Sequence, residues 1–236
     1  MKIGIVCFGL SFVAGGARLI FGLARSLEKR GHVVIVYAPD FDAEYYKEAA
    51  RGIDIRIVKP KAPLIWSGHP GNIVDWVRTK IAQERRFIDA SKRIADAMEK
   101  DLDIVNVHDF AYRTGYFYKK RNPKAQIIWT ENAPPYMYLP RKSIFFNLLG
   151  WTYQWTKEQT SKKYFRAIDK VAVLDFLNQK WSEDRGLKNV TVIRCGVDFD
   201  EFYAPVKDFS AKAKEKKVQL FALGALNPYR RGSIPL

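Results

Sequence analysis

A chain of 236 residues with 47% hydrophobic content can bury a full core, which excludes a disordered chain. Forty Lys and Arg against 25 Asp and Glu give a formal net charge of +15. An anionic partner is therefore expected: nucleic acid, a phosphorylated small molecule or an acidic membrane surface. The two cysteines, Cys7 and Cys195, have no spacing typical of a metal site or a disulfide framework, and no apolar run approaches the roughly 20 residues that span a bilayer.

Short apolar runs alternate with longer helical patterns over most of the chain. The expected strands are continuous apolar runs, several of them rich in β-branched residues, at Ile3–Phe8, His32–Tyr37, Ile53–Val58, Ile104–Val107, Ile127–Trp129, Val171–Leu174 and Val190–Ile193. The expected helices lie between them, at Ala17–Lys29, Ile73–Met98, Arg113–Lys120, Ile144–Arg166 and Phe176–Arg185. This alternation predicts an α/β fold, a doubly wound and mostly parallel Rossmann-like sheet with helices on both faces.

The domain boundary is expected in the last part of the chain. Residues 1–205 are interpreted as one Rossmann-like domain, and the lysine-rich residues 206–217 as an interdomain linker. The run VQLFALGALNPYRRG resembles the first strand and first loop of another domain, so residues 218–236 are expected to begin a truncated C-terminal domain. Ligands of such sheets gather at the carboxyl ends of the strands, which directs attention to the loops at that edge.

The first candidate site is the turn between the first strand and the first helix. Gly15 and Gly16 leave the backbone N–H groups of the helix start free to cradle a phosphate or a sugar. The glycines lack the G-x-G-x-x-G spacing of a dinucleotide site, although Asp40, after the second strand, could imitate the ribose-binding acid of such a site. A tight turn that needs two glycines explains the same pattern.

Polar residues follow two further strands. His108 and Asp109 place an imidazole and a carboxylate directly after the run DIVNV, where ligands bind, although a histidine that caps the backbone is the alternative. Glu131 and Asn132 follow the run QIIWT and could hydrogen-bond substrate hydroxyls, or could simply form a turn before a helix.

Two clusters of cations add further candidates. Arg230 and Arg231 follow a strand and a Pro-Tyr turn, and guanidinium groups bind diphosphate oxygens in a bidentate manner. Arg141–Arg166 mixes aromatic and apolar residues with lysines, as in an interfacial helix on anionic lipid. A helix packed on the sheet or over the acceptor cleft accounts for that segment as well. No RNA- or DNA-binding module is recognised, so nucleic acid is not the expected partner.

Taken in order, several segments resemble the N-terminal domain of GT-B fold glycosyltransferases of family four, a retaining group. The matching segments are MKIGIV with a GGA loop, RGH followed by alternating valines, DIVNVHD, DKVAVLD, NVTVIRCGVDFDEF and FALGALNPYRRG. The resemblance covers nearly the whole chain. It implies two Rossmann-like domains that face a cleft, with the nucleotide sugar held mainly by the C-terminal domain and the acceptor by the N-terminal one.

By this resemblance, Gly15 and Gly16 approach the donor diphosphate or the acceptor, and His108 contacts the transferred sugar. Arg230 and Arg231 stabilise the leaving phosphate as negative charge develops. No metal and no cofactor is expected besides the nucleotide-diphosphate sugar, which is a substrate. The paired glutamates of the family belong to the C-terminal domain, so this chain alone is expected to be inactive.

The expected function is the acceptor-binding half of a retaining glycosyltransferase of the hexosyltransferase type, active in cell-envelope or glycan biosynthesis. Its acceptor is expected to be phosphorylated, lipid-linked or a saccharide, and its location cytoplasmic, with peripheral contact to an anionic membrane left open. Two alternatives stay open: an NAD(P)-binding Rossmann oxidoreductase domain, which Asp40 favours, and a non-catalytic binding module.

Overall fold

A seven-stranded sheet forms the centre of the described part of the protein. The computed structural model describes residues 1–11, 15–65, 72–132 and 144–194, all within one unit, Met1–Gly196. The strands follow the order β3-β2-β1-β4-β5-β6-β7, and every neighbouring pair is parallel. They are β1 (Lys2–Val6), β2 (Val33–Ala38), β3 (Asp54–Ile57), β4 (Ile104–His108), β5 (Gln126–Glu131), β6 (Lys170–Val173) and β7 (Val190–Val192). The chain reverses its direction of travel across the sheet between β1 and β4, which is the switch point where ligands of such sheets bind.

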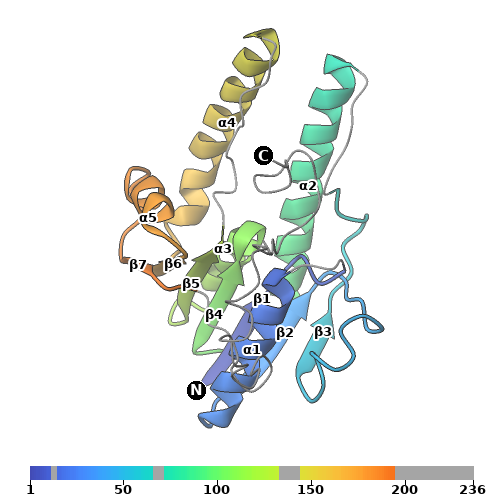
Figure 1. Cartoon of the computed structure of the whole chain (residues 1–236), viewed down its shortest axis with the longest axis vertical. Helices are drawn as coiled ribbons and strands as arrows, with labels where there is room; N and C mark the ends of the chain where they lie inside the picture. The colour runs from blue at the N-terminus through green and yellow to red at the C-terminus, as the bar shows by residue number, and fades with distance from the viewer. Residues whose placement is uncertain (12–14, 66–71, 133–143, 195–236) are drawn as a thin grey trace, which may run out of the picture. The chain divides into compact units, whose positions relative to one another are not determined.

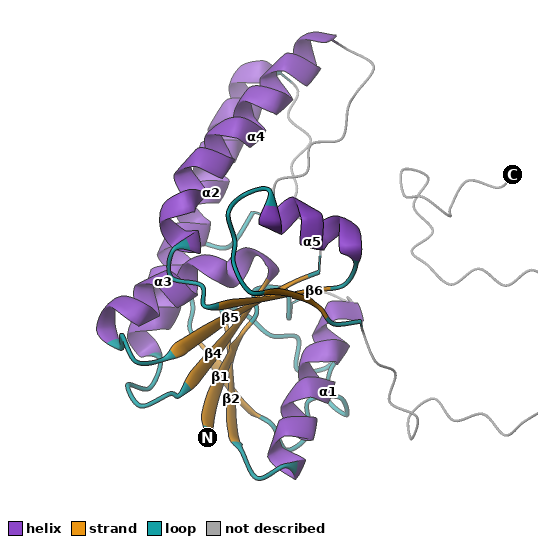
Figure 2. Ribbon diagram, turned by 90° about the vertical axis from the view of Figure 1, so that its left-hand side faces the viewer, coloured by secondary structure: helices purple, strands orange, loops and turns teal. Residues whose placement is uncertain are grey.

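The described helices cover both faces of this sheet. They are α1 (Gly15–Lys29), α2 (Ile73–Ala97), α3 (Tyr112–Arg121), α4 (Ile144–Phe165) and α5 (Phe176–Glu183), with a short 3-10 helix η1 (Asp109–Ala111) before α3. α1 lies on one face, and α2, α3 and α4 lie on the other (Figure 1 and Figure 2). α5 shares the face of these three, because Trp181 and Leu187 pack into their cluster. The right-handedness of βαβ crossovers explains this division. The connection through α1 runs from β1 toward the β3 edge of the sheet, whereas the connections through the other helices run toward the β7 edge. Right-handed connections that run in opposite directions place their helices on opposite faces.

Side chains of the central strands alternate between two hydrophobic clusters. In β1, Ile3 and Ile5 pack toward α1, whereas Val6 packs toward α2 and α3. In β4, Val105 and Val107 point to the α2 and α3 side. Because both faces of these strands are buried, the strands read as continuous apolar runs in the sequence.

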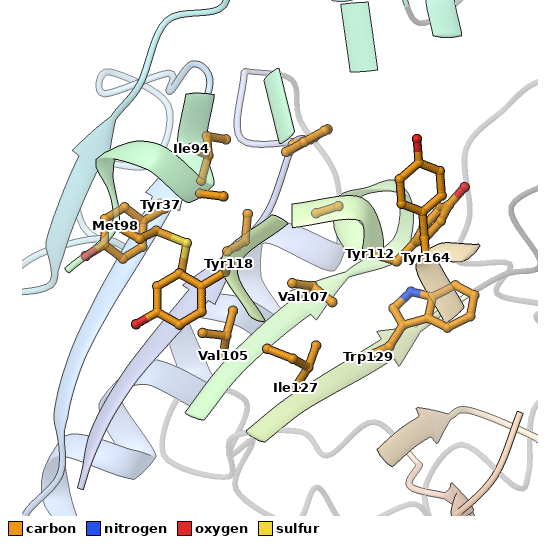
Figure 3. Packing of buried hydrophobic residues seen from close by; sticks show 14 of the residues in the cluster. Tyr37, Ile94, Met98, Val105, Val107, Tyr112, Tyr118, Ile127, Trp129 and Tyr164 are labelled. Atoms are coloured by element: carbon orange, nitrogen blue, oxygen red, sulfur yellow. The ribbon is translucent and has the colours of Figure 1, made fainter. Parts of the chain in front are cut away.

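Aromatic side chains fill the larger cluster, between the sheet and α2, α3 and α4 (Figure 3). Trp129 of β5 is fully buried, and its ring centroid lies 5.4 Å from that of Phe165 and 5.3 Å from that of Tyr112. α3 approaches β5 at Gly115, where an added Cβ would overlap the Cγ2 methyl of Ile127. Glycine at this position therefore sets how closely the helix packs on the sheet.

Buried ion pairs also join α2, α3 and α4. Glu84 of α2 pairs through Oε1 with Arg113 of α3, and its Oε2 lies 2.5 Å from Nζ of Lys157 on α4. The side chains of Arg113 and Lys157 are only 2% and 10% exposed. Burial lowers the pKa of Lys157, and the Glu84 carboxylate opposes that shift. One carboxylate thus holds two buried cations.

Local signals in the sequence determine where the helices begin and end. Asn72 caps α2 by accepting a hydrogen bond from the backbone N–H of Asp75 at 2.9 Å, and Asp175 caps α5 in the same way from Asn178 at 2.8 Å. After α1, Gly31 has a φ of 82°, the left-handed conformation that commonly terminates helices.

The predicted fold class is confirmed, and each predicted strand and helix lies at its expected place within a few residues. α1 begins earlier than predicted, at Gly15 rather than Ala17. The predicted linker at 206–217 and the start of a further domain at 218–236 lie outside the described residues, so the domain boundaries stay predictions. No helix in the described part of the chain combines the length and the apolarity that crossing a bilayer needs.

Candidate functional site

The candidate site lies at the carboxyl edge of the sheet, around the switch point. β4 ends at His108, α1 begins at Gly15 after β1, and β5, which pairs with β4, ends at Glu131. Because successive residues of a strand point to opposite faces, His108 projects away from the cluster that holds Val105 and Val107 and toward the face covered by α1. The sheet therefore places the imidazole and the start of α1 on the same face.

His108 is a neutral histidine at physiological pH. Its residue surface is only 5% exposed, and burial lowers its pKa to about 4. Its Nε2 is buried and has no hydrogen-bond partner among the described residues. A neutral imidazole carries one N–H donor and one acceptor nitrogen, so it is suited to binding a hydroxyl group. It carries no positive charge with which to form an ion pair.

Asp109 joins the ends of β4 and β5. Its carboxylate accepts two hydrogen bonds from Asn132, one from the backbone N–H and one from the side-chain Nδ2, both at 2.9 Å. Its carbonyl oxygen accepts a hydrogen bond from Nε1 of Trp129 at 3.0 Å. Asp109 has a φ of 45°, a left-handed conformation that is uncommon outside glycine. The structure thus joins two residues that were predicted in separate loops, because the side chains of Asp109 and Asn132 bond to each other.

Glu131 lies beneath α5 rather than at the open rim. It is fully buried, and Ser182 of α5 donates a hydrogen bond to its Oε2 at 2.8 Å. Burial raises its pKa to about 7; Ser182 and Arg185 lower the value, whereas the negative charges of Asp109 and Asp175 raise it. This position differs from the predicted role of binding substrate hydroxyls, because the side chain faces the helix that covers it.

The two predicted glycines lie in the first turn of α1. Gly15 is the first residue of the helix, and an added Cβ at Gly16 would meet no atom of the described residues within 4 Å. Gly16 has no left-handed φ, so neither the backbone nor a described neighbour requires glycine there. The first turn of α1 contains no acidic residue, so no side chain of this turn neutralises the positive end of the helix dipole, which favours an anion.

Two further titratable groups lie near this edge, the buried Cys7 and the half-buried Asp40. Cys7 is a free thiol, and burial raises its pKa to about 12, so it is neutral. The carboxylates of Asp109 and Asp40 act on it electrostatically, which places all three in one region. Burial also raises the pKa of Asp40, whose Oδ1 has no hydrogen-bond partner among the described residues. Asp40 is the acid that kept the oxidoreductase alternative open.

A polar pair on the His108 side of the sheet was not predicted from the sequence. Asn106 of β4 donates from Nδ2 to Oγ1 of Thr130 on β5 at 2.9 Å, and its Oδ1 is buried without a partner among the described residues. An asparagine inside the apolar run IVNVH was the signal that could have revealed it. On this face of the sheet, polar side chains thus continue from His108, at the carboxyl end of β4, to Asn106, two residues earlier in the strand.

The two remaining predicted site residues, Arg230 and Arg231, lie outside the described residues. Within residues 1–11, 15–65, 72–132 and 144–194, no three His, Cys, Asp or Glu side chains are grouped so that they could hold a metal ion.

The family model of Glycosyltransferase Family 4 matches residues 13–201, which is most of the chain. The chain belongs to this family. The match includes the start of α1, His108 and the ends of β4 and β5. It favours a glycosyltransferase over the oxidoreductase alternative. No curated protein sequence matches the chain.

Solved structures of glycosyltransferases share the fold. The Anabaena protein HepE, in complex with UDP and glucose, is 13% identical with a TM-score of 0.52, and the match covers 85% of this chain and 46% of that one. The catalytic domain of starch synthase IV from Arabidopsis thaliana, bound to ADP and acarbose, is 16% identical with a TM-score of 0.52, covering 88% of this chain and 54% of that one. The chain thus spans about half the length of these proteins and has the Rossmann-like fold of one GT-B domain.

Proposed function

We propose that this chain is the acceptor-binding domain of a retaining glycosyltransferase that uses a nucleotide-diphosphate sugar. The family match and the GT-B fold support it, and the single observation that carries it is the environment of His108. A neutral imidazole with an unpartnered Nε2 stands at the switch point, on the same face as a helix N-terminus without a side chain at Gly16. The first group suits a sugar hydroxyl, and the second suits a phosphate oxygen.

In the proposed reaction, the bond between the anomeric carbon and the diphosphate oxygen breaks, and a bond to an acceptor oxygen forms with the same anomeric configuration. The proton of the acceptor hydroxyl passes to the leaving diphosphate. His108 holds a hydroxyl of the transferred sugar and stays neutral throughout, because burial keeps its pKa far below physiological pH. The leaving diphosphate gains charge as the bond breaks, and Arg230 and Arg231 stabilise it together with the first turn of α1. The acceptor is a phosphorylated, lipid-linked or saccharide molecule.

Labelled histidine side chains offer a direct test, since the chain has three histidines. Ring-nitrogen NMR spectra recorded with a panel of nucleotide sugars, sugar phosphates and saccharides are expected to shift the His108 signals and leave those of His32 unchanged. The free protein is expected to keep the neutral form of His108 down to about pH 5. If no member of the panel shifts His108, or if NAD alone does, the proposal is wrong.

A pair of glycine variants in α1 separates ligand binding from folding. An added Cβ meets no described atom within 4 Å at either Gly16 or Gly22, so Gly16→Ala and Gly22→Ala are matched in the free protein. Only Gly16→Ala is expected to weaken the response of His108 to the ligand, by about tenfold in apparent affinity. Equal affinities in the two variants would show that the ligand does not approach the start of α1.

A further inference from the structure

The outward side of α4 exposes three large apolar side chains in a row. Leu148, Trp151 and Trp155 are 59%, 55% and 63% exposed. They are spaced three and four residues apart, which places them along one side of the helix. Tyr153, between them in the sequence, turns the other way and makes an edge-to-face contact with Trp76 of α2, at 5.4 Å between ring centroids. Single exposed apolar residues are ordinary, but a row containing two tryptophans indicates an interaction surface.

The same side of α4 becomes cationic toward its C-terminal end. Lys162 lies about four helical turns after Leu148, and Arg166, the residue that follows α4, lies about five turns after it. Both therefore continue the row on the same side of the helix. Both are exposed, and neither forms an ion pair with a described residue. We call Leu148, Trp151, Trp155, Lys162 and Arg166 the outer face of α4. The acidic content of the helix is low, since Glu158 is its one acid and is paired with Arg185 at 2.6 Å.

A pocket of about 410 Å³ opens where the cationic end of this face meets the segment after α5. Four cations and several apolar residues line it, among them Lys162, Arg166, Arg185, Lys188, Phe165 and Leu187. Lys188 is exposed and has no ion pair among the described residues. The pocket lies at the amino edge of the sheet, where α4 leads into β6 and α5 leads toward β7, so it is separate from the His108 site at the carboxyl edge.

We propose that the outer face of α4 is a docking surface for an anionic phospholipid bilayer. Tryptophans beside cations are typical of helices that lie in the interface of a membrane, with the indole rings at the level of the headgroups. At one end of the same face, Lys162, Arg166 and Lys188 line the pocket without an ion pair among the described residues, and a lipid phosphate can bind there. The net charge of +15 adds long-range attraction to the same surface. This inference goes beyond glycosyl transfer and does not depend on it.

Sedimentation of the 236-residue chain with vesicles tests the proposal. Binding is expected to phosphatidylcholine vesicles that contain phosphatidylglycerol, to weaken at high salt, and to be lost with phosphatidylcholine alone. The variant Lys162→Glu/Arg166→Glu is expected to lower the partition coefficient by about tenfold or more. Its control, Lys47→Glu/Lys59→Glu, makes the same change in net charge at two exposed lysines elsewhere and is expected to have a much smaller effect.

The two tryptophans need a separate experiment. Lipids with brominated chains are expected to quench the fluorescence of the wild-type chain, and Trp151→Ala/Trp155→Ala is expected to abolish the quenching although four of the six tryptophans remain. Val74→Ser/Val77→Ser removes exposed apolar residues from α2 and is expected to leave the quenching intact. Circular dichroism melting curves confirm that each variant is folded.

Each of these results would overturn the proposal: no binding to the anionic vesicles at low salt, equal losses in the two charge-reversal variants, or unchanged quenching without Trp151 and Trp155. A loss of quenching in the α2 variant equal to that in the α4 variant would also refute it, because the contact would then not belong to the outer face of α4. Vesicle binding is measured without donor or acceptor, so failure here leaves the proposed reaction standing.

Discussion

Replacing Glu131 by glutamine is expected to stabilise the protein, and to do so only above about pH 5. Glu131 is a fully buried carboxyl group held by one hydrogen bond from Ser182. Glutamine keeps an oxygen that accepts this bond and has almost the same shape, but it cannot ionise. The substitution therefore removes the cost of a buried charge and leaves the packing under α5 in place.

The size of the effect follows from the pKa of Glu131, which burial raises from 4.5 to about 7. Between these two values, the folded protein binds more protons than the unfolded chain, so the free energy of unfolding falls as pH rises. An interval of about 2.5 pH units at about 1.36 kcal/mol per unit corresponds to about 3 kcal/mol. The stability gained from Glu131→Gln is thus near zero at about pH 4 and approaches about 3 kcal/mol by about pH 8.

Urea unfolding of the wild type and of Glu131→Gln across this pH range measures the difference directly, because all other titrating groups cancel. Ser182→Ala is the companion variant. It removes the donor that lowers the pKa of Glu131, so it is expected to raise that pKa further. The pH dependence should then extend to higher pH in the protein that keeps Glu131, and none should be added in the glutamine variant. A difference between wild type and Glu131→Gln that stays constant from pH 4 to pH 8 would refute the reasoning.

Two further stability predictions rest on the packing of the helices. Gly115→Ala is expected to destabilise the protein by about 1–3 kcal/mol in urea unfolding, because the added methyl group overlaps Ile127. At Gly22 the added methyl group meets no described atom, so Gly22→Ala is expected to stabilise the protein by about 0.5–1 kcal/mol. Equal changes in the free energy of unfolding for the two variants would contradict the close contact between Gly115 and Ile127. Glu84→Gln is expected to cost about 3 kcal/mol or more, because two buried cations lose their carboxylate. A loss below about 1 kcal/mol would mean that water already screens these pairs.

Much of the candidate site could be predicted because it depends on strand order alone. Continuous apolar runs alternating with helices require a parallel sheet, and the carboxyl ends of its strands must meet at one edge. His108 and Gly16 therefore both lie at the carboxyl edge of the sheet, and the family match covers both residues. The local patterns also fixed the caps, since Asn72 and Asp175 begin helices by hydrogen bonds within three residues.

The sequence by itself determined the order and type of the elements, because each depends on neighbours a few positions apart in the chain. Tertiary structure alone decided the environment of each site residue, since burial and pKa depend on partners far away in sequence. Glu131 and Asn132 are adjacent in the chain, yet one lies under Ser182 of α5 and the other bonds Asp109 of η1. Likewise, a helix pattern does not reveal which of its apolar side chains remain exposed, so the row formed by Trp151 and Trp155 on α4 emerged only from the packed structure.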